Sequence, residues 1–516
     1  MPSTIADVFD RALGLGPDRE ALVTRSRRLT YAELDREANR SAHALGALGV
    51  RPGDRIAASL PNEADVVIAF HGAMRIGAVW VGVNRALAPP EKAYLLADSG
   101  ASLLLADDVV AAEEVGAPFG RVVTIAPGPS GQEWADALAS ADGSRPDVAV
   151  DPFAPAGLAY TSGTTGHPKG AVHSQHNLLL PGAVLVASRG YGPDVRKGDC
   201  LPLTILNLVV LTTLLVAQAG GCCIVMDRLD PEGIAAWIRD ERVTTWNGVP
   251  ALLHGLSTSD AVRREDLASL DEVWTGGGDC PDAIRAAFAE KFGHEVLATY
   301  GLSEAPTVVS IDPRGGPHVA GSSGRPLPHL RVRVVGDDGT AAPSGEVGEL
   351  HVSAATDGEW AGGYRPMLGY WGRPDGADVV QDGELRTGDL GYLDPDGNLH
   401  IRDRRNRLII RGGANVYPAE VERVLHAAPG VAAAVVLGIT DERLGERVVA
   451  AVEPAPSADL DLDLDLDLDR LRRHCLERLA AYKVPDRFVV VDALPRNAMG
   501  KVVLRDLPAL VDEAGP

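Results

Sequence analysis

Residues 160–170 read Tyr160-Thr161-Ser162-Gly163-Thr164-Thr165-Gly166-His167-Pro168-Lys169-Gly170. Apolar runs at 156–159 and 171–172 flank this stretch and indicate two strands joined by a loop. Glycines let backbone N–H groups turn inward to form an anion-binding nest, and Lys169 adds a point charge suited to phosphate. A Walker A loop would place Ser or Thr directly after its lysine, whereas Gly170 stands here. The stretch therefore predicts a cradle for a triphosphate.

Length and composition predict a globular chain of at least two domains. The chain has 516 residues, too many for one core, and 45% of them are hydrophobic. No apolar run reaches the ~20 residues of a membrane span, and the first residues do not resemble a signal peptide. The five cysteines show neither metal-binding spacing nor an even disulfide framework. We therefore expect a protein of the reducing cytoplasm, without a membrane span.

The charge balance argues against two classes of partner. A formal net charge of −22 disfavours nucleic acid and anionic membranes. A polyanionic substrate must then be held by local donors. Six of the 49 basic residues are lysine and the others are arginine. In such a chain a lysine suggests that its position requires a compact ammonium group.

The first 250 residues alternate between helix and strand patterns, which predicts a parallel sheet. A capping box at Thr30 begins a helix over 30–48, and Asn62 is predicted to cap a second helix that ends near Gly77. The remaining expected elements are strands at 55–59, 79–83, 102–106 and 243–246, a helix at 91–98 and a helix beginning at 230–231.

Beyond residue 320 the pattern changes to short strands separated by Gly, Pro and Asp. Strands at 332–335, 348–352 and 399–402 suggest a small β-rich lobe. A compact α+β unit is expected next, with strands 408–410, 431–437 and 447–452 and helices 418–427 and 470–481; the Asp-Leu alternation at 459–469 is expected to be an acidic loop. The predicted fold class is therefore α/β, with a large N-terminal domain (1–402) of parallel α/β subdomains plus the lobe, a hinge (403–407) and a mobile C-terminal α+β domain (408–516).

Further motifs follow the loop along the chain. They are Thr275-Gly276-Gly277-Gly278, Thr299-Tyr300-Gly301-Leu302-Ser303-Glu304, Arg386-Thr387-Gly388-Asp389-Leu390, the run from Asp403 to Gly413, and Pro495-Arg496-Asn497-Ala498-Met499-Gly500-Lys501. Together with the loop, these motifs resemble those of the adenylate-forming superfamily, which comprises acyl-CoA synthetases, beetle luciferases and peptide-synthetase adenylation domains. They occur in the order of that family and cover nearly the whole chain.

The resemblance implies a site for ATP and Mg²⁺. In the family the tyrosine packs on adenine, the hydroxyl at Ser303 (usually threonine) contacts the α-phosphate, and the glutamate holds Mg²⁺. The position of Asp389 accepts from both ribose hydroxyls, and that of Arg404 contacts the nucleotide. The implied ATP-binding set is Thr161, Ser162, Gly163, Thr164, Thr165, Gly166, Lys169, Gly276, Gly277, Gly278, Thr299, Tyr300, Gly301, Ser303, Asp389, Arg404 and Lys501; Lys501, Thr165 and Glu304 are the implied catalytic residues.

The chemistry of the family explains these residue types. A carboxylate attacks the α-phosphate of ATP and pyrophosphate leaves; because the nucleophile is already ionised at neutral pH, no general base is needed. Catalysis rests on positioning and on cations that bring one anion against another. A thiol of CoA then attacks the acyl-adenylate. The resemblance implies that the small domain first swings about a hinge at Asn406 and presents Gly412 and Gly413 along a pantetheine tunnel.

Two segments depart from the family pattern. Relatives that make CoA esters carry a Leu-Pro-Leu-Phe-His-like segment, whereas this chain has Leu201-Pro202-Leu203-Thr204-Ile205-Leu206-Asn207, and Asn406 replaces the usual Asp or Lys of the hinge. The smaller side chains predict an open acyl pocket that prefers a bulky or long-chain acid. Its predicted residues are Thr204, Ile205, Asn207, Trp246, Gly248 and Ala298.

The leading interpretation is a cytoplasmic acid–CoA ligase, AMP-forming, acting on a small-molecule carboxylic acid as a monomer or homodimer. One alternative is an adenylating enzyme that stops at acyl-AMP or transfers the acyl group to a carrier protein. Another is a nucleotide-binding protein without turnover, although Lys501 would then have no purpose.

Overall fold

The structure is a computed structural model that forms two compact units. One comprises Met1–Val332 with His351–Thr387, the other Arg333–Leu350 with Gly388–Pro516. The structure describes all residues except 114–119, 162–167, 277–279, 317, 374–378, 405–406, 412–413, 442–443, 456–466, 480, 497–501, 509–510 and 512–516. The hinge predicted at 403–407 concerns the movement of the C-terminal domain rather than compactness, so it stays a prediction.

The first unit contains a six-stranded sheet in the order β6-β5-β3-β4-β7-β8. All neighbours pair in parallel except β7 and β8, which are antiparallel. Its strands are β3 (Arg55–Ser59), β4 (Val79–Gly82), β5 (Leu103–Ala106), β6 (Arg121–Thr124), β7 (Pro155–Thr161) and β8 (Lys169–Ser174). The predicted parallel α/β architecture is confirmed.

A nine-stranded sheet in the same unit has the order β15-β14-β13-β12-β11-β9-β10-β1-β2. The strands from β13 to β1 run parallel to one another, so the carboxyl ends of β11, β12 and β13 meet at one edge. The strands are β1 (Glu20–Val23), β2 (Arg28–Thr30), β9 (Arg196–Asp199), β10 (Cys222–Val225), β11 (Thr245–Gly248), β12 (Glu272–Thr275), β13 (Val296–Leu302), β14 (Ala305–Ile311) and β15 (Arg325–Pro326).

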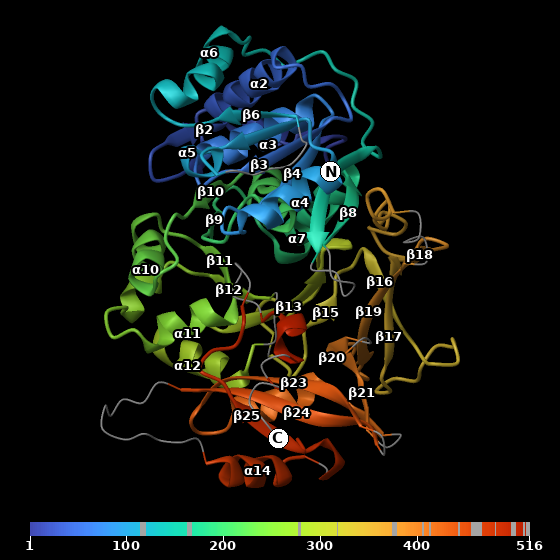
Figure 1. Ribbon diagram of the computed structural model, residues 1–516. Coiled ribbons are helices and arrows are strands. Elements are labelled where there is room, and N and C mark those ends of the chain that lie inside the picture. The colour runs from blue at the N-terminus through green and yellow to red at the C-terminus, as the bar shows by residue number, and fades with distance from the viewer. Residues whose placement is uncertain are drawn as a thin grey trace. The chain divides into compact units, whose positions relative to one another are not determined.

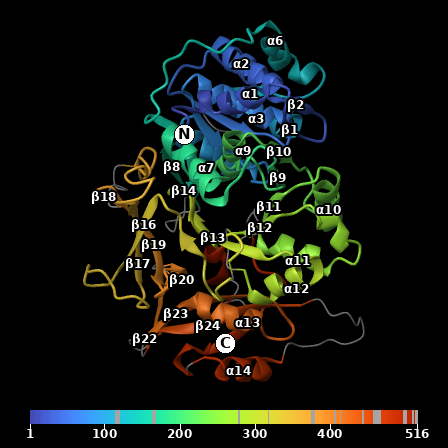
Figure 2. The same ribbon diagram turned by 180° about the vertical axis from the view of Figure 1, so that it is seen from behind.

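Helices cover both sheets, with α11 and α12 beside β11 and β12 in both views (Figure 1, Figure 2). The helices of this unit are α1 (Asp10–Leu15), α2 (Tyr31–Ala47), α3 (Ala64–Arg75), α4 (Pro89–Ser99), α5 (Asp108–Ala111), α6 (Gln132–Ser140), α7 (Gln175–Arg189), α8 (Leu206–Val209), the π-helix η3 (Val210–Leu214), α9 (Leu215–Ala219), α10 (Pro231–Asp240), α11 (Pro250–Thr258) and α12 (Asp282–Phe292). No helix in the described ranges is long and apolar enough to cross a membrane.

Local signals placed most helix ends correctly, but the helix predicted over 470–481 ends at Leu476, and the predicted start of the second helix is also wrong. The capping box at Thr30 and the cap at Asp230 are both present. The predicted cap at Asn62 is wrong, because Glu63 occupies that position. The Asn62 amide instead donates to the carbonyls of Leu201 (2.9 Å) and Met226 (3.1 Å) and accepts from Leu203 N–H (2.9 Å). A residue expected to begin a helix therefore holds the distant segment that was predicted to line the acyl pocket.

The β-rich lobe and the C-terminal α+β region are also present. A five-stranded sheet has the order β16-β17-β19-β18 with β20 on β19, and the unit boundaries fall inside β16, β17 and β19. The next sheet has the order β22-β21-β24-β23 with β25 on β24. The elements are β16 (Leu330–Val335), β17 (Gly348–Ala354), β18 (Val380–Gln381), β19 (Glu384–Leu393), β20 (Leu399–Arg404), β21 (Ile409–Arg411), β22 (Ala414–Val416), α13 (Pro418–His426), β23 (Val431–Asp441), β24 (Gly445–Pro454), α14 (Leu468–Leu476) and β25 (Arg487–Val490).

The acidic Asp-Leu loop lies mostly outside the described residues. Asp467, at its end, caps α14 by accepting from the backbone N–H of Arg470.

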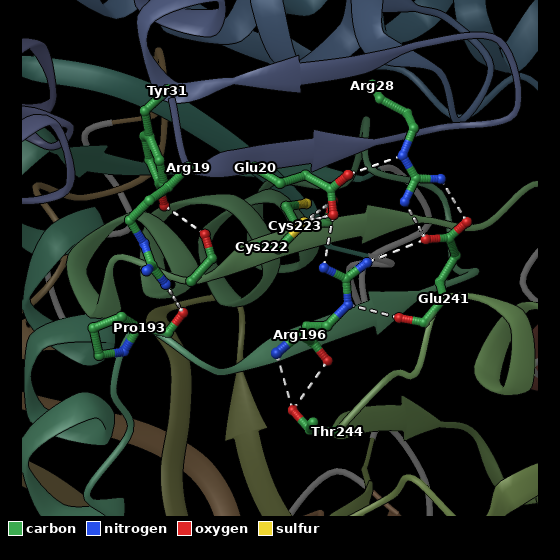
Figure 3. Close-up of polar contacts among 11 residues, drawn as sticks. Arg19, Glu20, Arg28, Tyr31, Pro193, Arg196, Cys222, Cys223, Glu241 and Thr244 are labelled. Carbon is green, nitrogen blue, oxygen red and sulfur yellow. Dashed lines mark hydrogen bonds and ion pairs between the residues drawn. The ribbon is translucent and has the colours of Figure 1, made fainter. Parts of the chain in front are cut away.

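A network of charges joins strands that are far apart in sequence (Figure 3). Arg28 on β2 and Arg196 on β9 each contact both Glu20 on β1 and Glu241 after α10, at 2.7 to 3.1 Å. Burial would raise the pKa of Glu20, but hydrogen bonds from Arg196 and Arg28 outweigh burial and lower that pKa. Because these side chains are partly exposed, each pair adds little stability, and the network chiefly fixes which strands are neighbours.

Gly82 at the end of β4 lies against the segment 201–207. A Cβ at this position would lie 1.5 Å from the carbonyl oxygen of Thr204. At Gly46 inside α2, by contrast, an added Cβ would meet nothing within 4 Å. The two glycines are therefore a matched pair for testing how closely the segment packs on the sheet.

We predict that Gly82→Ala destabilises the fold by ~1–3 kcal/mol, because the backbone of Thr204 must move. Gly46→Ala should instead stabilise it by ~0.5–1 kcal/mol, since alanine is the better helix former. Thermal melting followed by circular dichroism measures both. A Gly82→Ala melting temperature equal to that of the wild type would contradict the close packing.

Candidate active site

The antiparallel pair β7–β8 holds both ends of the predicted phosphate loop. Thr161 on β7 lies opposite Lys169 on β8, and Thr161 Oγ1 is 3.5 Å from the Lys169 carbonyl oxygen. Residues 162–167, which include Ser162, Gly163, Thr164, Thr165 and Gly166, lie outside the described residues. The loop therefore leaves and re-enters the sheet at adjacent points, as a cradle requires.

Tyr370 connects the base of this loop with Glu304. Its hydroxyl donates to Glu304 Oε1 at 2.8 Å, and Lys169 Nζ lies 5.5 Å from its ring centroid. Main-chain bonds hold the tyrosine beside β8, from Val172 N–H to Gly369 O (2.9 Å) and from Trp371 N–H to Gly170 O (2.8 Å). Sequence reasoning missed Tyr370, because its place depends on a contact across some 200 residues.

His173 on β8 holds the turn that carries Glu304. The ring is fully buried, and burial lowers the pKa of His173 to about 4. The imidazole is therefore neutral near pH 7, and its Nε2–H donates to the Ser303 carbonyl at 2.6 Å. Lys169, His173, Ser303 and Glu304 are thus brought together around one strand.

The predicted adenine side lies at the carboxyl ends of β12 and β13. Thr299 Oγ1 donates to the Thr275 carbonyl at 2.9 Å, and a Cβ at Gly276 would lie 2.3 Å from that hydroxyl. A side chain at 276 would have to displace the Thr299 hydroxyl, so this close approach favours glycine there. Tyr300 is half-buried and Gly301 is exposed, whereas Gly277 and Gly278 lie outside the described residues.

In the second unit Asp389 and Arg404 form an ion pair. They lie opposite each other on β19 and β20, with Arg404 Nε 3.1 Å from Asp389 Oδ1. The Asp389 side chain is 5% exposed and the Arg404 side chain 50%, so the carboxylate is fixed while the guanidinium reaches solvent. Asn406, Gly412, Gly413 and Lys501 lie outside the described residues, so their roles stay predictions.

The predicted acyl-pocket residues differ in exposure. Ile205, Asn207 and Ala298 are half-buried, as residues lining a pocket would be, while Thr204 and Gly248 are buried. Trp246 is fully buried and packs in the hydrophobic core between the sheet and its helices, with Leu253 and Phe288 among that cluster. A Cβ at Gly248 would lie 2.4 Å from the Trp246 ring, so this glycine makes room for the indole.

Known proteins were compared with the chain as a whole. A family model described as "AMP-binding enzyme" matches residues 9–371, and one described as "AMP-binding enzyme C-terminal domain" matches residues 420–501. The chain belongs to the AMP-binding enzyme family.

Individual family members are similar over nearly their whole length. A feruloyl-CoA synthase of Amycolatopsis sp is 36% identical over 480 residues, with 92% of each chain covered. The long-chain-fatty-acid–CoA ligase FadD13 of Mycobacterium tuberculosis is 34% identical over 495 residues, again with 92% of each covered. The crystal structure of ATP-bound MatB from Rhodopseudomonas palustris is 29% identical with a TM-score of 0.84, covering 97% of this chain and 98% of that one.

The expected activity is confirmed at the level of the family. This AMP-binding enzyme is an AMP-forming acid–CoA ligase: it uses ATP to make an acyl-adenylate and CoA to form the thioester carbon–sulfur bond. Its relatives do not favour a nucleotide binder without turnover or an enzyme that stops at the adenylate.

The residues of the site fit the Mg²⁺ that accompanies ATP in this family. The half-buried Glu304 offers a carboxylate, and its bond to Tyr370 orients one oxygen and leaves the other for a cation. Within the described ranges no group of three His, Cys, Asp or Glu forms a metal cage. Mg²⁺ is usually bound by one or two carboxylates together with substrate phosphates, and it would neutralise phosphate charge here.

We predict that Glu304→Gln slows adenylation on the order of 10²–10³-fold, because a neutral amide replaces the charged oxygen that a hard cation needs. The Mg²⁺ concentration for half-maximal rate should rise. Tyr370→Phe serves as the control, since it removes the 2.8 Å hydrogen bond but keeps the Glu304 carboxylate. The adenylation rate of Tyr370→Phe should fall less than that of Glu304→Gln. Pyrophosphate release measures both variants, and an unchanged Mg²⁺ dependence in Glu304→Gln would place the metal elsewhere.

Proposed function

We propose that this AMP-forming ligase activates a bulky or long-chain carboxylic acid. The observation that carries the proposal is the segment 201–207, where Thr204 and the half-buried Ile205 stand in place of an aromatic and a histidine. The segment is held by Asn62 and Gly82 next to the strands of the site. Two relatives, named for feruloyl and long-chain fatty acyl products, support a large acid.

In this proposal the loop at 161–166 and Lys169 bind the β- and γ-phosphates, and Glu304 holds Mg²⁺. Tyr300 with Gly276–Gly278 receives adenine, and Asp389 receives ribose. Lys501 bridges the carboxylate and the α-phosphate in the first step. The domain 408–516 then turns about 403–407, so that Lys501 leaves and Gly412-Gly413 line the path of pantetheine. The acyl group is transferred to CoA rather than to a carrier protein. The enzyme acts in the cytoplasm as a monomer or homodimer.

We predict that Lys501→Ala abolishes adenylate formation and spares thioester formation from pre-made acyl-AMP, since the lysine serves the first step alone. Lys483→Ala is the matched control, because the Lys483 ammonium contacts Glu420 at 2.7 Å within the same unit and should spare both half-reactions. Separate assays of pyrophosphate release and thioester formation measure the two steps. A Lys501→Ala enzyme that makes adenylate at the wild-type rate would overturn the assignment.

We predict that Ile205→Trp lowers kcat/KM for bulky acids and spares acids of two to four carbons, because overpacking where the acyl group lies costs ~1–3 kcal/mol. Leu15→Trp on α1, where the leucine is 51% exposed, controls for the added indole. Pyrophosphate release across acids of graded size decides the outcome. A wild-type preference for the smallest acids, or an equal loss for all acids in Ile205→Trp, would refute the open pocket.

A further inference from the structure

A buried polar bridge lies at the carboxyl ends of β9 and β11, beneath the segment 201–207. Lys197 and Asp199 are two residues apart on β9 and therefore point to the same face, and both are 0% exposed. Asn247 lies on the neighbouring strand β11 and is half-buried. We refer to Lys197, Asn247 and Asp199 as the Asn247 bridge.

The contacts of the bridge join sheet, covering helix and pocket segment. Lys197 Nζ donates to Asn247 Oδ1, and Asn247 Nδ2 donates to Asp199 Oδ2 at 3.0 Å. The hydroxyl of Thr212, from the π-helix η3, donates to the same Oδ2 at 2.9 Å. Asp199 Oδ1 accepts from Leu201 N–H at 2.9 Å, where the pocket segment begins. One carboxylate thus holds three elements, and π-helices are frequent at functional sites.

The two charges fix the orientation of the Asn247 amide. An ammonium is only a donor and a carboxylate only an acceptor, so the amide oxygen must face Lys197 and the amide nitrogen must face Asp199. A flipped amide would place donor against donor and acceptor against acceptor. One N–H and one lone pair of the amide are not used in these contacts, and both point in fixed directions.

Burying the Lys197 and Asp199 charges costs free energy, because both groups lose their hydration. Burial lowers the pKa of Lys197 and raises that of Asp199, and the opposite charge of each partner works against that effect. Lys197 Nζ also lies 4.9 Å from the Trp274 ring centroid, a further compensation. Proteins in which apolar side chains replace a buried ion pair are often as stable as the original or more stable. The stability of the fold alone therefore does not explain why two charges are buried here.

We propose that the Asn247 bridge is a specificity device: Asn247 binds a neutral hydroxyl or ether group on the acid, remote from its carboxylate, and Lys197 and Asp199 are positioning residues for that amide. Two other polar atoms of the pocket segment, Thr204 Oγ1 and Asn207 Oδ1, are buried and have no hydrogen-bond partner among the described residues. Buried polar atoms without a partner favour a ligand that can form hydrogen bonds with them.

The bridge also limits the charge of that group. The opposite charges of Lys197 and Asp199 balance each other, so an ionic substituent buried beside Asn247 would lose its hydration without a net countercharge to compensate. A neutral group that both donates and accepts, such as a phenol, matches the unused N–H and lone pair. The inference rests on the proposed function, because it assigns a substituent to the bulky acid of the same pocket.

The test compares cinnamic, 4-hydroxycinnamic and 4-carboxycinnamic acids by pyrophosphate release. The wild type should prefer the hydroxylated acid over the unsubstituted one by roughly 10- to 100-fold in kcat/KM, and should reject the dicarboxylic acid. Lys197→Met/Asp199→Asn removes both charges at similar volume and should bring the preference close to 1, because kcat/KM for 4-hydroxycinnamic acid should fall further than kcat/KM for cinnamic acid. Asn247→Ala, which leaves room for water beside both charges, should likewise bring the ratio of kcat/KM for the two acids close to 1, and it serves if the double variant does not fold.

The control is Arg75→Met/Asp35→Asn, which removes an ion pair (2.6 Å) between the buried Arg75 of α3 and the partly exposed Asp35 of α2 and should keep the wild-type preference. A wild type without preference for the hydroxylated acid overturns the inference. So does a folded double variant that loses both acids by the same factor, because a structural role alone would act that way. Absence of pyrophosphate release with every acid would instead refute the proposed function.

Discussion

Strand β8 is the constraint on which the site depends. Its main chain bonds to β7 on one edge and to residues 368–371 on the other. Its own side chains supply Lys169 at one end and the buried His173 near the other. The loop ends, Tyr370 and the turn at Ser303-Glu304 are therefore placed by one ladder of backbone hydrogen bonds. A reaction that presses one anion against another needs cations whose positions are set before the substrates arrive, and a strand bonded on both edges provides such positions.

The electrostatics of the chain follow from the same requirement. A protein with net charge −22 repels ATP at long range, so its attraction must come from groups close to the phosphates. Charge is accordingly local. Lys169 lies at the loop, Arg404 lies beside Asp389, and the buried Lys197 is matched by Asp199. Each of these three cations is paired or stacked, which limits its freedom to move.

Sequence reasoning recovered what short stretches encode. The capping box at Thr30, the alternation of helix and strand, and the order of the motifs need no knowledge of distant contacts, and they were enough for the fold class and the family. Asn62 shows the limit, since its side chain meets the local criterion for a cap yet binds carbonyls at 201 and 226. Tyr370, His173 and Asn247 were missed for the same reason. Each acts through a partner that only the folded sheet brings near.

The place of β1 in the large sheet has a consequence for folding during synthesis of the chain. Residues 20–23 pair in parallel with β10, which ends at Val225, and β9 pairs with the opposite edge of β10. The N-terminal strand therefore leaves the ribosome about 200 residues before its neighbour, and until then its backbone groups on that edge are unpaired. Such non-local pairing slows folding. A nascent chain that stops short of β10 would expose an unpaired strand, so translation speed through the first half and chaperone access to it bear directly on the yield of active enzyme.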